Sequence, residues 1–195
     1  ILYEGTSFFQ SGAAEQGAMR QDWGITYQSG GLFSAMTLAE NITLPLELYT
    51  SYTPAEITDI VAYKLALVGL AGYQSYYPSE ISGGMQKRAA LARAIALDPK
   101  ILFFDEPSAG LDPISSRLLD ELIVQIKESM GATVVMVTHE LPSIFAIATN
   151  SVYLDNITRT MIAYGNPADL RDHSPQPVVR QFLTRSAAAA TLDQP

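Results

Sequence analysis

The chain has 195 residues, which is enough for one domain with a hydrophobic core or for two small lobes. Hydrophobic residues make up 48% and charged residues 16%, as in ordinary globular proteins, and no apolar run approaches the ~20 residues that span a bilayer. The net charge of −8 argues against a nucleic-acid partner, and the lack of cysteine excludes disulfides and thiolate zinc sites. The chain opens without a charged and then apolar leader, so secretion is not indicated.

The first third of the chain changes from strand patterns to helix patterns. Residues 1–5, "ILYEG", predict a strand inside a sheet that runs into a glycine turn. Residues 24–33, "GITYQSGGLF", predict a short strand that leads into a glycine pair. From residue 34 to residue 97 the pattern is mostly helical.

Two helices in this region carry clear start signals. Thr53 is followed by Pro54 at the first turn and by Glu56 three residues after the cap, which predicts a capping box. Ser82 predicts the cap of the next helix, which we expect to end at Asp98 and the following proline.

A strand, a helix and a strand follow in that order. Residues 100–107, "KILFFDEP", and 132–139, "ATVVMVTH", predict strands of a parallel sheet that are buried on both faces. The helix between them stops at Gly131, and its predicted buried face is formed by Leu118, Leu119, Leu122, Ile123 and Ile126. Ligands of such a right-handed unit bind at the carboxyl ends of the strands. Polar residues stand at both of these ends: Asp105, Glu106, Thr138 and His139.

The last part of the chain predicts small elements. A short helix is expected after His139, and a hairpin is expected over residues 151–165 with its turn near Asp155. Two further short helices, residues 166–173 and 177–185, precede a frayed tail.

The polar strand ends have a chemical interpretation. An aspartate such as Asp105 at the end of a buried strand can hold Mg²⁺ through water, because this ion prefers oxygen ligands and keeps part of its water shell. Glu106 can orient a water for in-line attack on a phosphoryl group, and His139 can contact a γ-phosphate. The alternative is a strand-end turn with solvated acids and a hydrogen-bonded histidine.

The helix that Ser82 caps could bind an anion. Its free N–H groups, with two glycines that let the backbone approach closely, suit a phosphate, although an ordinary capped helix would look the same. Lys87, Arg88 and Arg93 either assist this site or form a solvated face. Gln28, after the short strand, could bind Mg²⁺ through its carbonyl oxygen.

A phosphate-binding loop of the form G-x-x-x-x-G-K-[ST] is not found in the sequence. The lysines stand at positions 64, 87, 100 and 127, and none of them follows a glycine. The chain therefore contains half of a nucleotide-hydrolysing site.

Taken in chain order, these motifs resemble those of the ATP-binding subunits of ABC transporters. "YQSGGLF" is similar to the Q-loop, "ISGGMQKR" to the signature, "ILFFDE" to the Walker B strand, "SAGLD" to the D-loop and "VTHE" to the switch histidine. The resemblance implies an α/β fold, the RecA-like core of a P-loop NTPase with a helical subdomain, truncated at the N-terminus. It divides the chain into core parts at 1–33 and 99–165, a helical part at 34–98 and a C-terminal extension at 166–195.

The same resemblance implies ATP and Mg²⁺ as ligands and assigns roles to residues. It implies catalytic roles for Glu106 and His139, and metal binding by Gln28 and Asp105. The nucleotide-binding residues that it implies are Gln28, Ser82, Gly83, Gly84, Asp105 and Asp112.

A narrower resemblance is to the ATPases of Mla-type, MCE-associated phospholipid transport systems of Gram-negative envelopes. It rests on Met85, "RAALARAIALDP", "DEPSAGLDPI" and "VVRQFL". It implies a subunit at the cytoplasmic face of the inner membrane, paired head to tail with a second ATPase subunit. Further implied partners are permease subunits and a periplasmic MCE lipid-binding subunit.

The family's phosphate loop lies before the point where "ILYEG" begins, so we expect this chain by itself to be inactive. Three alternatives stay open: the ATPase of another ABC importer or exporter, a non-catalytic subunit, and an ATPase of chromosome maintenance. The last would need a long coiled coil between the Q-loop and the signature, where only residues 29–81 lie.

Overall fold

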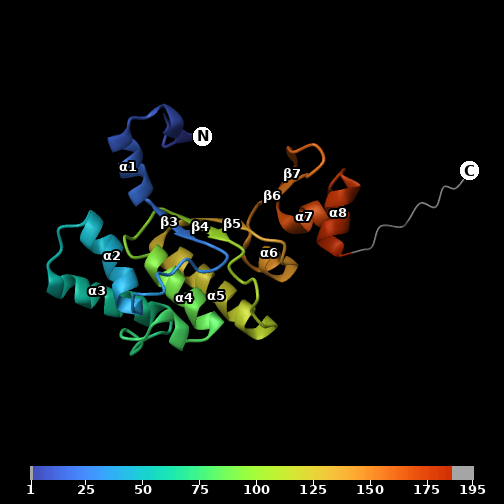
Figure 1. Ribbon diagram of the computed structural model, residues 1–195. Helices are drawn as coiled ribbons and strands as arrows, with labels where there is room; N and C mark the ends of the chain where they lie inside the picture. The colour runs from blue at the N-terminus through green and yellow to red at the C-terminus, as the bar shows by residue number, and fades with distance from the viewer. Residues whose placement is uncertain (1, 186–195) are drawn as a thin grey trace, which may run out of the picture. The chain divides into compact units, whose positions relative to one another are not determined.

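The computed structural model describes residues 2–185 (Figure 1). The chain forms two compact units, Ile1–Thr138 and His139–Pro195, and each is described by itself. This boundary differs from those of the predicted subdivision, which stays a prediction. Among residues 2–185, no helix combines the length and the apolar character that crossing a membrane requires.

The first unit is built on a three-stranded sheet in the order β3-β4-β5. Its strands are β3 (Trp23–Thr26), β4 (Ile101–Asp105) and β5 (Thr133–Val137), and both pairings are parallel. Helix α5 (Pro113–Met130) connects β4 to β5. The predicted strand, helix and strand are therefore confirmed, and the carboxyl ends of β4 and β5 lie at one edge.

Helices cover one face of this sheet. Helix α4 (Gly83–Ala94) and α5 lie along it in Figure 1, and Leu91, Phe104 and Leu119 bring α4, β4 and α5 together. On the opposite face, Ile25 and Val135 stand in one row across the sheet and are exposed, as is Val137. The prediction that these strands are buried on both faces is wrong, because within residues 2–138 the long helices pack on one side only.

Helix α5 follows its sequence signals closely. Asp112 caps its start and Gly131, with a φ of 64°, ends it in the left-handed conformation that glycine adopts without strain. Leu119, Ile123 and Ile126 are buried as predicted. Leu118 is 60% exposed, so its place in the predicted buried face is wrong.

The N-terminal segment forms a small structure of its own. Strands β1 (Leu2–Tyr3) and β2 (Thr6–Ser7) pair antiparallel, and the 3₁₀ helix η1 (Phe8–Gln10) and α1 (Ala13–Gln21) follow. The predicted first strand is thus only two residues long and lies in a separate ribbon, not in the main sheet. Aromatic rings anchor this segment to the sheet, with Trp23 in contact with Tyr3, Phe8 and Phe103.

A helical region separates β3 from β4. It consists of α2 (Leu38–Tyr49), α3 (Pro54–Leu67), the 3₁₀ helix η2 (Pro78–Glu80) and α4. Capping boxes begin α2 and α3, and the one at Thr53 and Glu56 was predicted. Helix α4 ends at Ala94, before the predicted stop. The buried side chains of this region include Leu38, Ile42, Leu46, Val61, Leu65, Leu91 and Ile95.

The second unit contains the predicted short elements. Helix α6 (Leu141–Ile147) is followed by the antiparallel strands β6 (Ser151–Leu154) and β7 (Met161–Gly165). Helices α7 (Pro167–His173) and α8 (Pro177–Thr184) complete it. Its core is formed by Leu141, Leu170, Val179 and Leu183. The predicted tail, residues 186–195, lies outside the described residues.

Candidate functional site

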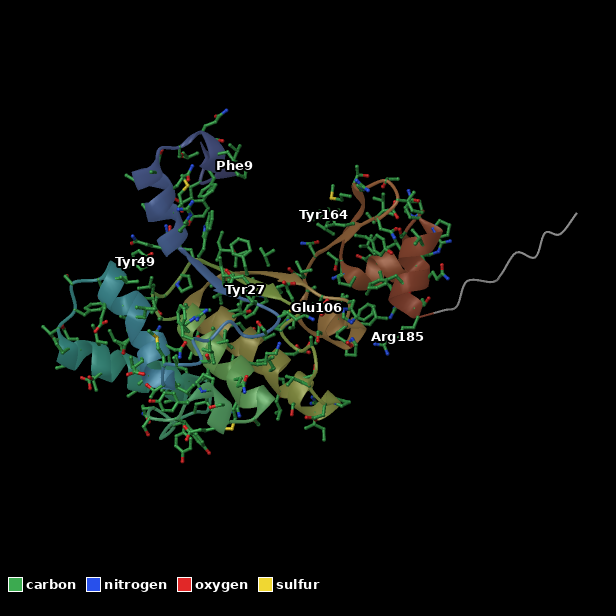
Figure 2. The ribbon with its side chains drawn as sticks, viewed as in Figure 1. Phe9, Tyr27, Tyr49, Glu106, Tyr164 and Arg185 are labelled. Atoms are coloured by element: carbon green, nitrogen blue, oxygen red, sulfur yellow. The ribbon has the colours of Figure 1, made fainter. Side chains whose placement is uncertain are left out.

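The acidic pair stands where β4 leaves the sheet. Asp105 is the last residue of β4, lies opposite Val137 in the register and is exposed. The backbone N–H of Glu106 donates to the carbonyl of Val137 at 2.9 Å, and the Thr138 hydroxyl donates to Oε2 of Glu106 at 3.3 Å. The carboxyl ends of β4 and β5 therefore bring Asp105, Glu106 and Thr138 together, as predicted. Glu106 is labelled in Figure 2.

The backbone of Glu106 is strained. Its φ is 46°, a conformation that non-glycine residues seldom adopt because the Cβ crowds the backbone. Such strain costs on the order of 1–3 kcal/mol and persists where surrounding contacts enforce it. Here the backbone bond to Val137 and the side-chain bond from Thr138 hold the residue from both sides.

Gln28 lies in the loop that follows β3. Because Thr26 pairs with Phe104 in the parallel register, this loop leaves the sheet at the same edge as the acidic pair. The ammonium of Lys87, on α4, donates a hydrogen bond to the backbone carbonyl of Gln28. Lys87 thereby connects α4, which we call the signature helix because the signature residues begin it, to the loop that carries Gln28, the predicted metal ligand.

The charges of the acidic pair also act on Lys87. Partial burial lowers the pKa of its ammonium, and the negative charges of Glu106 and Asp105 act in the opposite direction. Since both carboxylates act on the charge of Lys87, the residue belongs electrostatically to the site. The sequence left open whether Lys87 assists this site or lies on a solvated face. Its bond to Gln28 and its partial burial do not fit the solvated face.

Arg88 and Arg93 also have partners in the chain. Arg88 Nη1 donates to the carbonyl of Val68 at 3.2 Å. Arg93 Nη1 donates to the carbonyl of Gly31 at 2.5 Å, and its guanidinium carbon lies 5.5 Å from the centre of the Phe33 ring. Both side chains hold loops against α4.

The signature residues begin α4 and face outward. The hydroxyl of Ser82 accepts a hydrogen bond from the N–H of Met85 at 3.3 Å, which confirms it as the cap. Ser82 and Gly83 are exposed, and a Cβ added at Gly83 would have no neighbour within 4 Å. At Gly84 the nearest atom would be 3.8 Å away, on Leu111. Packing within this chain therefore does not require these two glycines.

The carboxylate of Asp112 caps the start of α5. It accepts hydrogen bonds from the N–H groups of Ile114 and Ser115, both at 3.0 Å. The hydroxyl and then the N–H of Ser115 hold the pKa of Asp112 below its ordinary value. Its predicted role at a nucleotide stays a prediction.

His139 is the first residue of the second unit. Its side chain is 68% exposed, and Nε2 lies 3.5 Å from a carboxylate oxygen of Glu140. The predicted role of His139 at a phosphate stays a prediction.

The residues predicted to hold Mg²⁺ offer suitable donors. Asp105 and Gln28 supply a carboxylate and an amide oxygen, and both side chains belong to exposed residues. In the described part of the chain, no group of three or more His, Cys, Asp or Glu residues gathers to hold a metal by itself. A carboxylate and an amide oxygen are the kinds of donor that Mg²⁺ takes in small number while it keeps several waters.

A cavity of about 340 Å³ lies beside the loop, between α1, β3, α2 and α4. The residues that line this cavity are Gly17, Arg20, Gln21, Trp23, Gly24, Ile25, Phe33, Leu44, Pro45, Leu48, Tyr49, Arg93, Ala94 and Leu97. Phe33, Leu48 and Tyr49 are exposed, and Tyr49 is labelled in Figure 2. Apolar side chains are thus presented to solvent beside the Gln28 loop.

The family of the chain follows from comparison with known proteins. The family model described as "ABC transporter" matches residues 1–109. The chain belongs to the ABC transporter family.

Two bacterial relatives in this family are informative. The "Probable ribonucleotide transport ATP-binding protein mkl" of Mycobacterium tuberculosis is 42% identical over 94% of this chain. The chain spans only 50% of that protein. The "Intermembrane phospholipid transport system ATP-binding protein MlaF" of Escherichia coli is 38% identical over 94% of this chain and 67% of MlaF.

Solved structures of ABC ATPase cassettes share the fold. The ATP-binding cassette MJ0796, a dimer in a post-hydrolysis state bound to ADP and Pi, matches with a TM-score of 0.74 and 26% identity over 84% of this chain and 71% of that one. The cbiO1 protein of Clostridium perfringens, part of the complex cbiONQ, has a TM-score of 0.78 at 24% identity over 95% of this chain and 72% of that one. The predicted α/β fold of a P-loop NTPase in the ABC family is confirmed.

Sequence reasoning missed two side chains that organise this ABC cassette. It left the position of Lys87 open, and it did not single out Asn41, whose side chain is fully buried in α2. Asn41 bonds both the N–H and the carbonyl of Phe33. An asparagine inside a helix pattern was a detectable signal, since that residue seldom favours a helix interior.

Proposed function

We propose that the chain is part of an ATP-binding and ATP-hydrolysing subunit of an ABC transporter that powers phospholipid transport across a cell envelope. One observation carries the proposal: Asp105 and Glu106 leave the sheet where Thr138 bonds Glu106, at the same edge as the loop of Gln28, which the ammonium of Lys87 bonds. Acids at a strand end, next to an amide and a cation, suit a phosphoryl group with its metal ion.

Each residue of the site has a distinct role in this proposal. Asp105 and Gln28 hold Mg²⁺, which when bound neutralises charge on the phosphate oxygens. Glu106 orients the attacking water and accepts its proton, with Thr138 keeping the carboxylate in place. His139 contacts the γ-phosphate.

The signature helix serves a nucleotide held by a second subunit. Ser82, Gly83 and the N-terminus of α4 are exposed, and the space around Gly83 is open within this chain. A helix N-terminus with free N–H groups attracts a phosphate. The dimeric arrangement of MJ0796 bound to ADP and Pi supports the pairing of two such subunits.

A membrane partner would contact the cavity beside the Gln28 loop. The exposed Phe33, Leu48 and Tyr49 offer apolar surface, and the cavity of about 340 Å³ can receive side chains of an inserted helix. We propose permease subunits as this partner and an MCE lipid-binding subunit beyond them. The ATPase subunit would then lie at the cytoplasmic face of the inner membrane.

Phospholipid is the proposed cargo because MlaF is 38% identical and this chain spans 67% of it. The name of the mycobacterial relative, at 42% identity, supports ribonucleotide transport as the second candidate. The two cargoes call for different membrane partners, so the choice can be tested.

The experiment uses the full-length product of the gene, purified with the membrane proteins that co-purify with it. Reconstituted into vesicles, the complex should hydrolyse ATP and move a fluorescent phospholipid between vesicles in an ATP-dependent manner. Transport of a labelled ribonucleotide without lipid movement would favour the second candidate. A full-length complex that hydrolyses no ATP would overturn the proposed activity.

A further inference from the structure

The loop after β3 is fastened to the signature helix at two points. Lys87 donates to the carbonyl of Gln28, and Arg93 donates to the carbonyl of Gly31 at 2.5 Å. Both donors are side chains of α4, the helix that Ser82 begins. The loop therefore runs along α4 between two cations.

Close backbone packing accompanies these bonds. Gly30 has a φ of 79°, and a Cβ added there would lie 3.5 Å from the Cβ of Ala90, on the same helix. The N–H of Gly30 donates to the carbonyl of Tyr27 at 2.7 Å, which closes a tight turn around Gln28. A side chain at Gly30 would be strained, so this turn depends on glycine.

Of the two attachments, the one at Lys87 stands next to the proposed chemistry. Its ammonium is partly buried, and taking a charge out of water is unfavourable unless other groups compensate. The carbonyl of Gln28 and the negative charges of Glu106 and Asp105 supply that compensation. An apolar side chain of similar length, such as methionine, would keep neither the bond nor the balance of charge.

We propose that Lys87 is a positioning residue for the hydrolysis proposed above: its ammonium fixes the backbone of Gln28 on the signature helix and balances the charge of Asp105 and Glu106. The inference rests on the proposed function. It adds a residue that acts through Gln28 and the acidic pair and does not itself contact the reacting atoms. It also assigns α4 two tasks, since its N-terminus faces a second subunit while Lys87 holds the loop of its own subunit.

The test compares Lys87→Met, Lys87→Gln and Lys87→Arg in the full-length protein with its membrane partner. Lys87→Met removes bond and charge, so kcat should fall roughly 10- to 100-fold, as for other residues that orient a metal site, with little change in KM for ATP. The half-saturating Mg²⁺ concentration should also fall, because the uncompensated carboxylates attract the cation more strongly. A merely structural role, which would only loosen the proposed ligand Gln28, would raise that concentration and not lower it.

The other two variants separate the bond from the charge. Lys87→Arg keeps both and should restore much of kcat and the wild-type Mg²⁺ dependence. Lys87→Gln keeps a donor without charge, so its Mg²⁺ dependence should resemble that of Lys87→Met. Lys127→Met, at the end of α5, is the matched control and should behave as wild type.

Amide hydrogen exchange gives a readout that does not need hydrolysis. Lys87→Met should speed exchange over residues 28–33 and leave β4 and α5 unchanged. If the wild type hydrolyses ATP while Lys87→Met matches it in kcat, Mg²⁺ dependence and exchange, the inference about Lys87 fails and the proposed function stands. If the wild type hydrolyses no ATP, the proposed function fails, and unchanged exchange would then also overturn the attachment of the loop by Lys87.

Discussion

The hydroxyl of Thr138 donates a hydrogen bond to the carboxylate of Glu106 across 3.3 Å, and so joins the ends of two neighbouring parallel strands. Glu106 has a strained backbone with a φ of 46°, and the bond from Thr138 is one of the contacts that hold it. A carboxylate held in this way is pre-oriented, which is what positioning a water for attack requires.

Replacing Glu106 by Gln should abolish ATP turnover in the full-length protein and leave ATP binding intact. The amide keeps the shape and the contact to Thr138 but cannot accept a proton from water, which should lower kcat by roughly 10²- to 10⁴-fold. Steady-state hydrolysis and equilibrium binding of a labelled nucleotide measure the two effects. Glu121→Gln, on α5 beside Arg117, is the control and should retain activity. Unchanged hydrolysis by Glu106→Gln would contradict its role.

Replacing Ser82 by Arg should prevent two subunits from closing around ATP. The residue is exposed at the start of α4, so a long cationic side chain should fit in the monomer but obstruct a partner's nucleotide. Loss of the cap should lower stability by only ~1 kcal/mol. ATP-dependent dimerisation can be followed by light scattering, with Ser129→Arg at the end of α5 as the control. Normal dimerisation by Ser82→Arg would count against the role of the signature helix.

Replacing Asn41 by Leu should destabilise the first unit. The Asn41 amide is fully buried and donates to the carbonyls of Phe33, Met36 and Thr37 at 3.1, 3.1 and 2.9 Å. Leucine would remove these bonds and leave the N–H of Phe33 without its partner, so the free energy of unfolding should fall by roughly 2–4 kcal/mol.

Urea denaturation measures this loss. The exposed Asn156, in the turn of the hairpin, provides the matched variant Asn156→Ala, which should change stability by less than about 0.5 kcal/mol. Equal stability of the two variants would show that Asn41 does not hold the loop.

The capping box of α3 should make stability depend on pH. The N–H of Thr53, and then its hydroxyl, hold the pKa of Glu56 below its ordinary value of 4.5. Because the folded-state pKa is lowered, the ionised carboxylate stabilises the fold above pH 4.5, and this contribution is lost as the pH falls through the folded-state value.

Glu56→Gln is the matched variant, because glutamine can form the same box without a titrating charge. Thermal unfolding should show wild type more stable than Glu56→Gln at pH 7, with the difference shrinking in acid. A difference that grew on acidification would refute the assignment.

Local chemistry allowed much of the fold to be predicted from sequence. The cap at Thr53, the stop at Gly131 and the hairpin near Asp155 depend on residues close in the chain, so their signals survive without knowledge of the fold. The meeting of Asp105, Glu106 and Thr138 could also be predicted, since neighbouring parallel strands end at one edge of the sheet.

What the sequence by itself determined is the strand, helix and strand around the acidic strand ends and the capped helices, because hydrophobic period and capping are local properties, whereas α1 (Ala13–Gln21) carried no signal that was recognised. Only the tertiary structure decided that Lys87 reaches Gln28, that Asn41 holds Phe33 and that Val135 and Val137 are exposed. These facts depend on which face each helix turns to its neighbours. That choice is made by packing between segments far apart in the chain, and no local pattern of residues encodes it.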